Sequence, residues 1–224
     1  MADAVLRVLT VLAAATASAA LAPSAAAYDA LSRTPAPAGR ALAVAGEGAV
    51  DRTLMRARTI GAEVDARYAG LRVTETSSTA VIESLTLFDG DEPRVVPADR
   101  GIYYAVCPTG ATCPYPGRAA GPATALVPRR VALELALRTF AETSADLVVI
   151  SLPTRGFTLL VVERGAIDCE RLTPAMARYS PADQSLEVRR IVDAATLDHV
   201  YVPFGLFPTA SGRDSLLASP LGLP

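Results

Sequence analysis

Two nearly continuous runs of apolar residues lie close together in the second half of the chain. The runs are Leu147–Leu152 and Phe157–Glu163, and the short connection Pro153–Gly156 separates them. Each run has the length of a strand and lacks the polar alternation of a strand with one exposed face. The pattern predicts an antiparallel hairpin over residues 147–163, at the centre of a sheet that is covered on both faces.

A helix over residues of about 128–143 would cover this hairpin on one side. It begins with a proline, which a helix tolerates best in its first turn, and apolar residues surround most of its circumference. Its charged residues alternate in sign every four positions: Arg130, Glu134, Arg138 and Glu142. We expect this stripe to form the single exposed edge of a mostly buried helix.

Helices are also predicted over residues of about 48–69 and 181–195. In the first, apolar residues recur every three or four positions, and the second follows Ser180, a residue typical of helix caps. Strand-like runs fill residues 71–106, with a tight turn expected at 77–78. The predicted fold class is α+β: a single domain with a mainly antiparallel sheet, its central hairpin covered by helices.

The N-terminal segment has the pattern of a bacterial signal peptide. Arg7 precedes an uncharged apolar run, and three alanines precede Tyr28, so residues 1–27 are expected to be removed by cleavage between Ala27 and Tyr28. An uncleaved membrane anchor is the alternative, although the run is shorter than the ~20 residues that a span needs. The rest divides into a Pro/Ala-rich linker, a globular domain and a loosely ordered tail, over residues 28–39, 40–203 and 204–224.

Export would place the protein outside the bacterial cytoplasm: secreted, periplasmic or associated with the cell wall. In such a compartment, Cys107 and Cys113, six positions apart in a Pro/Gly-rich loop, are expected to form a disulfide. The third cysteine, Cys169, lies between two carboxylates that disfavour its thiolate, so we expect an inert thiol. Contact with a membrane is expected only through an uncleaved N-terminal segment.

Composition excludes several kinds of chemistry. The chain has no lysine, which Schiff-base catalysis, Ser-Lys dyads and phosphate-binding P-loops require. Its net charge of −2 gives no support for nucleic-acid binding. Neither the cysteine spacing nor the acidic turn at residues 89–92 has the ligand pattern of a zinc or calcium site, and no cofactor is predicted.

Few residues are candidates for a functional site. Arg129 and Arg130 open a predicted helix, where backbone N–H groups and guanidinium groups together can hold an anion. His199 is the only histidine, so any histidine-dependent catalysis must use it. Asp168 and Glu170 are an acid pair of the kind that glycoside cleavage uses.

Two functions remain open at this stage. The first is an exported domain of the cell envelope that binds a partner protein or a small ligand, without catalysis. The second is an exported hydrolase that works through acidic residues or His199. Binding is favoured because no catalytic motif, such as the G-x-S-x-G of serine hydrolases, is present in the chain.

Overall fold

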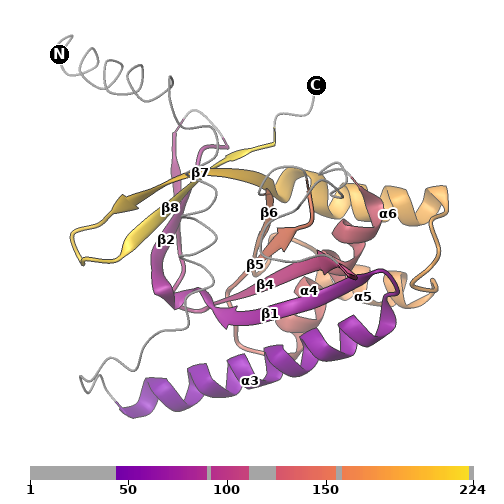
Figure 1. Ribbon diagram of the computed structural model, residues 1–224, viewed down its shortest axis with the longest axis horizontal. Helices are drawn as coiled ribbons and strands as arrows, with labels where there is room; N and C mark the ends of the chain where they lie inside the picture. Colours follow the sequence, from indigo (N-terminus) through magenta and orange to yellow (C-terminus); the bar gives the residue numbers. More distant parts are fainter. Residues whose placement is uncertain (1–43, 90–91, 111–124, 155–157, 222–224) are drawn as a thin grey trace, which may run out of the picture.

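The computed structural model describes residues 44–89, 92–110, 125–154 and 158–221, with side chains described from Arg52 onward. Four α-helices and eight strands lie within these residues (Figure 1). The helices are α3 (Val44–Arg67), α4 (Leu126–Glu142), α5 (Cys169–Ala177) and α6 (Leu186–Thr196). The strands are β1 (Leu71–Ser78), β2 (Ile82–Leu87), β3 (Arg94–Pro97), β4 (Gly101–Pro108), β5 (Leu147–Leu152), β6 (Thr158–Glu163), β7 (Val200–Pro208) and β8 (Asp214–Pro220).

The predicted hairpin is confirmed as β5 and β6. The two strands pair antiparallel, from Leu147 opposite Glu163 to Leu152 opposite Thr158, and Glu163 is the only residue of the pair that is not buried. Successive side chains enter two different cores: Ile150 packs in one and Val149 in the other. Apolar residues are therefore needed on both faces of these strands, which explains their nearly continuous apolar sequence.

The α+β single-domain prediction is confirmed, and the sheet itself is mixed. Its strand order is β1-β4-β5-β6-β7-β8-β2-β3, and the pairings β4–β5 and β2–β8 are parallel, whereas the others are antiparallel. The first parallel pair arises because α4 connects β4 to β5 as a crossover helix. The second arises because the last strand of the chain inserts beside β2, far from it in sequence.

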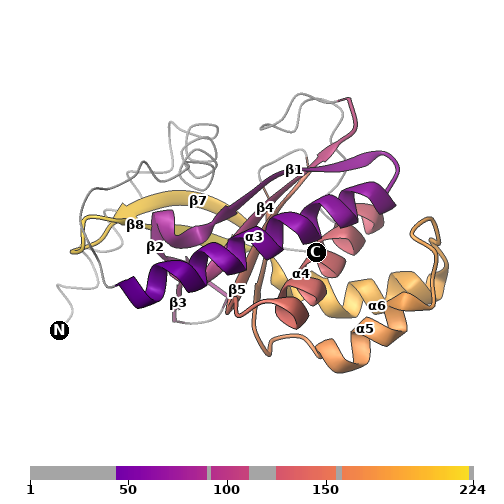
Figure 2. The same ribbon diagram turned by 90° about the horizontal axis from the view of Figure 1, so that it is seen from below.

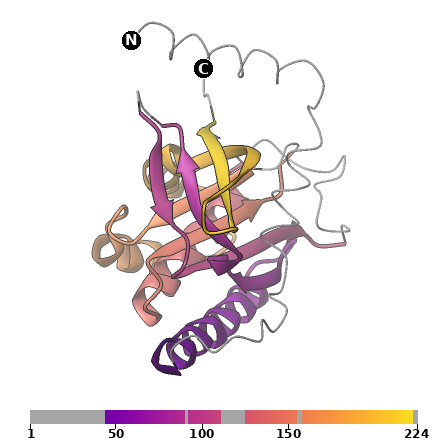
Figure 3. The same cartoon turned by 90° about the vertical axis from the view of Figure 1, so that its left-hand side faces the viewer.

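The sheet separates two hydrophobic cores (Figures 1 and 3). The first core lies between the four helices and the strands β4, β5 and β6. The second lies where β2, β3 and β8 pack over the opposite face of those strands, with Leu85, Val96 and Leu216 against Val149. The side of β3 turned away from this second core exposes Val95.

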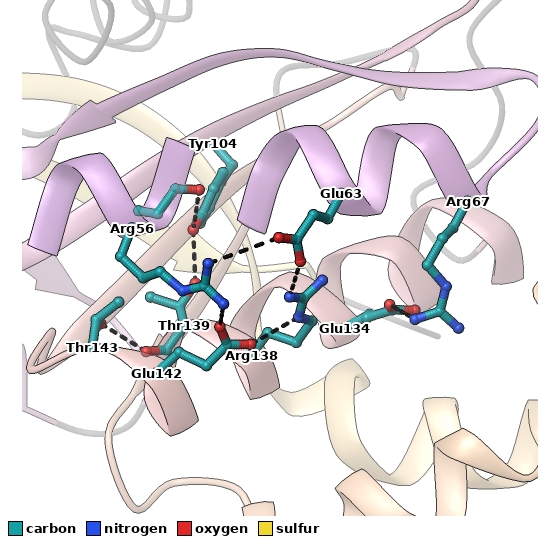
Figure 4. A network of polar contacts seen from close by, with 10 residues as sticks. Arg56, Glu63, Arg67, Tyr104, Glu134, Arg138, Thr139, Glu142 and Thr143 are labelled. Atoms are coloured by element: carbon teal, nitrogen blue, oxygen red, sulfur yellow. Dashed lines mark hydrogen bonds and ion pairs between the residues drawn. The ribbon is translucent and has the colours of Figure 1, made fainter. Parts of the chain in front are cut away.

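The charged stripe of α4 faces α3 rather than forming an exposed edge (Figure 4). Arg138 pairs with Glu142 on its own helix and with Glu63 on α3, and Glu142 also accepts from Arg56. Glu134 accepts hydrogen bonds from Arg67 and Tyr68, and Arg130 is buried elsewhere. The expectation of an exposed edge was wrong because α3 packs along this side of the helix.

Several predicted boundaries also need correction. The helices expected at 48–69 and 128–143 are found within a few residues of those limits as α3 and α4. The helix expected at 181–195 begins only at Leu186, because the N-cap is Ser185, whose hydroxyl accepts from the Val188 N–H at 3.4 Å. No tight turn occurs at 77–78: these residues end β1, and the Ser78 hydroxyl caps a short 3₁₀-helix at Thr79–Val81.

The C-terminal residues are not a loose tail. Strand β7 continues to Pro208, and β8 lies between β7 and β2 in the interior of the sheet. Leu216 and Ala218 of β8 are fully buried in the second core. The sequence did not predict β8 because only three of its seven residues, Leu216, Leu217 and Ala218, are aliphatic, which is too few for a clear strand pattern.

The predictions for the N-terminus lie outside the described residues. They are the signal peptide with its cleavage at Ala27–Tyr28, the alternative anchor, and the linker of residues 28–39. Within the ranges that the structure describes, no helix combines the length and apolar character needed to cross a membrane.

Candidate functional site

A pocket of about 540 Å³ lies between α5 and α6, which run beside each other at one end of the molecule (Figure 2). The segment before α5 and His199 after α6 complete its wall. This volume is within the ~300–1,000 Å³ that small-molecule sites occupy. It is therefore large enough for an organic ligand of modest size.

Local sequence signals position both helices of the pocket. The Asp168 carboxylate caps α5 by accepting from the Arg171 N–H at 3.0 Å, and Ser185 caps α6 in the same way. Helix α5 begins at Cys169 and contains Pro174. Helix α6 is amphipathic: Val188 and Val192 are fully buried, whereas its opposite side faces solvent or the pocket.

Arg129 and Arg130 of α4 hold the pocket helices in place through hydrogen bonds. Both side chains are buried, although they come from the first turns of α4. Arg129 donates from Nη1 to the Thr196 hydroxyl at 2.9 Å and from Nη2 to the Asp193 carboxylate at 2.5 Å, which fixes α6 against α4. Charge-assisted hydrogen bonds of this kind are stronger than those between neutral groups.

Arg130 holds the connection between α5 and α6. Its guanidinium donates to the backbone carbonyl of Ser180 at 2.6 Å, to that of Tyr179 at 3.3 Å, and to that of Asp183. These two arginines were the predicted anion site. The structure gives them protein oxygens as partners, and anion binding at Arg129 and Arg130 remains a prediction.

The floor of the pocket is apolar. It is formed by Ile167, Leu172, Ile191 and several alanines, among them Ala175 and Ala194. Ile167 is only 7% exposed and belongs to the first hydrophobic core, so the floor is continuous with the interior of the protein. A ligand with an apolar body would remove further apolar surface from water here.

Four charged residues surround this floor. The two carboxylates already have partners, whereas the two arginines have none among the residues that the structure describes. Asp168 is occupied as the cap of α5, and Glu187 lies beside the Tyr179 hydroxyl, whose pKa this contact raises. Arg171 and Arg190 come from different helices, and neither side chain has an ion pair or hydrogen bond with any residue the structure describes. The pocket therefore offers two exposed cationic groups that are not already neutralised.

His199 forms one end of the pocket and is half-buried. Burial lowers the pKa of its imidazole below the ordinary value, and the adjacent Asp198 only partly opposes this shift. The ring is therefore neutral at pH 7. Among the described residues, no side chain forms a hydrogen bond with it.

A polar cluster beyond His199 ties the ends of four strands together. The Asp89 carboxylate accepts from Arg94 at 2.9 Å and from the Tyr201 hydroxyl at 2.8 Å, and Arg94 also pairs with Glu163. Burial alone would raise the pKa of Asp89, but these hydrogen bonds outweigh it and lower that pKa. Burial and the Asp89 contact together raise the pKa of Tyr201 to about 12. These groups satisfy one another and act as a structural link.

Neither of the two described cysteines, Cys107 and Cys169, lines this pocket. Cys169 is a free, half-buried thiol at the start of α5, and burial raises its pKa. That direction agrees with the expectation of an inert thiol. Cys107 lies in β4, one residue before its end, whereas Cys113 lies outside the described residues, so their predicted disulfide stays a prediction. Within the described part of the chain, no three His, Cys, Asp or Glu side chains gather as metal ligands would.

A second hollow of about 450 Å³ lies between the start of α3 and the end of α4. Six of its seven lining residues are polar or charged, including Arg56 and Glu142, which already pair with each other. It has no apolar floor on which the body of a ligand could rest. We therefore regard the α5–α6 pocket as the stronger candidate.

Sequence reasoning identified His199 and Asp168 but missed Arg171 and Arg190. A usable signal existed: Arg190 lies next to Ile191 on an amphipathic helix, at the border of its apolar face. The placement of this side of α6 opposite α5 depends on the tertiary contacts of the buried Arg129 and Arg130. No local sequence pattern predicts those contacts. No protein-family model matches the chain, and no curated protein or solved structure shows significant similarity to it.

Proposed function

We propose that the protein is an exported bacterial domain that binds a small molecule in the α5–α6 pocket. The observation that supports binding is the pocket itself. It has the volume of a ligand site, an apolar floor, and two exposed arginines that pair with no residue the structure describes. Support for export comes from the N-terminal sequence, with its apolar run and its three alanines before Tyr28.

A thermal-shift panel tests the binding proposal. The panel contains alkyl and naphthyl compounds that each carry a carboxylate, a hydroxyl or an ammonium group. At least one compound is expected to raise the melting temperature of the wild-type protein. Ala194→Trp, which places a large ring over the pocket, should abolish that shift, whereas Ala177→Trp on the outer side of α5 should preserve it.

Two results of the panel would overturn the proposal. One is the absence of a shift with every compound. The other is a shift that survives in the Ala194→Trp variant, because the compound would then bind elsewhere. Both variants are first compared with the wild type by circular dichroism, so that loss of binding is not confused with loss of folding.

Export has its own test in the native host. The mature product recovered outside the cytoplasm should have the intact mass of a chain that begins at Tyr28. A full-length cytosolic product would contradict export and would leave the binding proposal unaffected.

The alternative function, a hydrolase that uses His199, requires a nucleophile or a water-activating carboxylate at the imidazole. It predicts that His199→Gln abolishes turnover of an ester or glycoside substrate. Screening the wild type and this variant against chromogenic esters and glycosides tests that alternative directly.

A further inference from the structure

Resting on the proposed function, we infer that the pocket selects an amphiphilic anion: a molecule with an apolar body and a negatively charged head. The inference combines three features of this pocket. The first two are the apolar floor and the two cationic groups at its mouth. The third is that both nearby carboxylates, Asp168 and Glu187, already have partners.

The floor determines the part of the ligand that enters. Ile167, Leu172 and Ile191 present only carbon atoms at their side-chain ends, and four alanines complete the apolar part of the lining: Ala166, Ala175, Ala194 and Ala195. A hydrocarbon body gains free energy there by leaving water, whereas a sugar or a peptide would lose hydrogen bonds without replacement.

The mouth determines the sign of the head group. Arg171 extends from α5 and Arg190 from α6, so an anion between them would meet one guanidinium from each helix. Several other arginines of the described chain are already paired, as Arg138 is with Glu63 and Glu142. Arg171 and Arg190 are not, and forked guanidinium donors match the oxygens of carboxylates and phosphates.

The two acidic residues of the pocket do not favour a cation instead. The Asp168 carboxylate faces the N–H groups of the first turn of α5, and Glu187 lies beside Tyr179. A cationic head would have to take these carboxylates from partners that they already have, and it would also lie near two unpaired arginines. An anionic head requires neither change.

Carboxylate and phosphate heads share this chemistry, and two probes distinguish them. Isothermal titration calorimetry compares octanoate, octyl phosphate, octanol and octyltrimethylammonium, each below its micelle concentration. Either anion should bind at least about tenfold more tightly than octanol, since a charge-assisted hydrogen bond has that effect on a dissociation constant. The tighter of the two anions identifies the head group.

Variants then assign the effect to the two arginines. Arg171→Gln and Arg190→Gln should each weaken binding of the preferred anion about tenfold while leaving octanol binding unchanged. Arg189→Gln is the matched control, since Arg189 is also exposed on α6 but does not line the pocket. All three positions are exposed, so the variants should fold like the wild type, which melting curves verify.

The outcomes separate this inference from the proposed function. If octanol or octyltrimethylammonium binds as tightly as the anions, and Ala194→Trp blocks it, the pocket binds small molecules but the anion inference is wrong. The inference also fails if both arginine variants bind the anion as the wild type does. If nothing binds in the pocket, the proposed function itself fails.

Discussion

His199 is the only histidine in the chain, so its protonation can be followed as a single ring resonance. Burial lowers its pKa, and Arg94 adds to the shift, while Asp198 acts in the opposite direction. We predict a titration midpoint below the ordinary value of about 6.5, measured by NMR between about pH 4 and pH 8. A midpoint above that value would contradict the burial of the ring.

The same shift has a consequence for stability. The unfolded chain binds this proton at higher pH than the folded chain does, so the free energy of unfolding should fall as pH drops below about 6.5. His199→Gln removes this contribution and should flatten the pH dependence over that window. Urea unfolding of both proteins at several pH values gives the comparison.

Gly101, at the start of β4, is a position where only a glycine fits. A Cβ atom there would collide with the Thr79 hydroxyl and lie 3.2 Å from Leu147 Cβ, and that hydroxyl already donates to the Ala98 carbonyl at 2.5 Å. We predict that Gly101→Ala lowers the free energy of unfolding by about 1–3 kcal/mol. Urea denaturation measures this loss.

Gly205→Ala is the matched control for that substitution. Gly205 is also in a strand, but its added Cβ would only reach Leu217 Cδ1 at 3.7 Å, an ordinary contact. The change in unfolding free energy should stay within about 0.5 kcal/mol. Equal losses of unfolding free energy in Gly101→Ala and Gly205→Ala would contradict the collision described at Gly101.

Helix α6 depends on the buried Arg129 for its position. Arg129 is 1% exposed, and the Asp193 carboxylate that neutralises it is the link to this helix. Asp193→Ala leaves a buried cation without its carboxylate, and we predict a loss of about 2–4 kcal/mol in unfolding free energy. Asp198→Ala, at an exposed carboxylate just after α6, should change it by less than about 0.5 kcal/mol.

The Asp193→Ala variant also tests whether the position of α6 affects ligand binding in the pocket. If Arg129 fixes α6, the pocket should loosen, and anion binding should weaken even though Asp193 does not line the pocket. Unchanged stability and unchanged binding in Asp193→Ala would contradict the role given to Arg129.

Sequence patterns predicted some elements well and others poorly, for a physical reason. The hairpin β5–β6 was predictable because burial on both faces leaves two apolar runs of strand length, separated by a short connection. Helix α4 was predictable too, but not the direction of its charged stripe, because the position of α3 is a tertiary property. The pocket was unpredictable for the same reason: Arg171 and Arg190 meet only after α5 and α6 are in place.

At the scale of the whole molecule, β8 connects two parts of the sheet. It pairs with β7 on one side and with β2 on the other, and β2 with β3 covers the second core. Truncation after Pro208 would leave both neighbours with unpaired edges and would uncover the core. We predict that the truncated chain fails to fold cooperatively.

A milder truncation provides the control. A chain that ends at Leu221 keeps β8 entire and should unfold with the same midpoint as the full chain. Cooperative unfolding of the chain that ends at Pro208 would show that the last strand is as dispensable as its composition suggested. Thermal unfolding followed by circular dichroism distinguishes the two cases.

The outer side of β7 is a second apolar surface with which ligand binding in the α5–α6 pocket can be compared. It exposes Phe204 and Phe207, and the Phe204 ring lies 5.4 Å from that of Phe88. A probe that merely seeks exposed apolar surface would therefore also bind here.

The central claim, that the α5–α6 pocket binds a small amphiphilic anion, is tested most directly by mapping where octanoate binds. Amide resonances of the labelled protein are followed during a titration with octanoate. The account predicts saturable shifts confined to residues 166–175 and 187–199, and their loss in Ala194→Trp. Shifts centred on the outer side of β7, or no saturable shift at all, would contradict it.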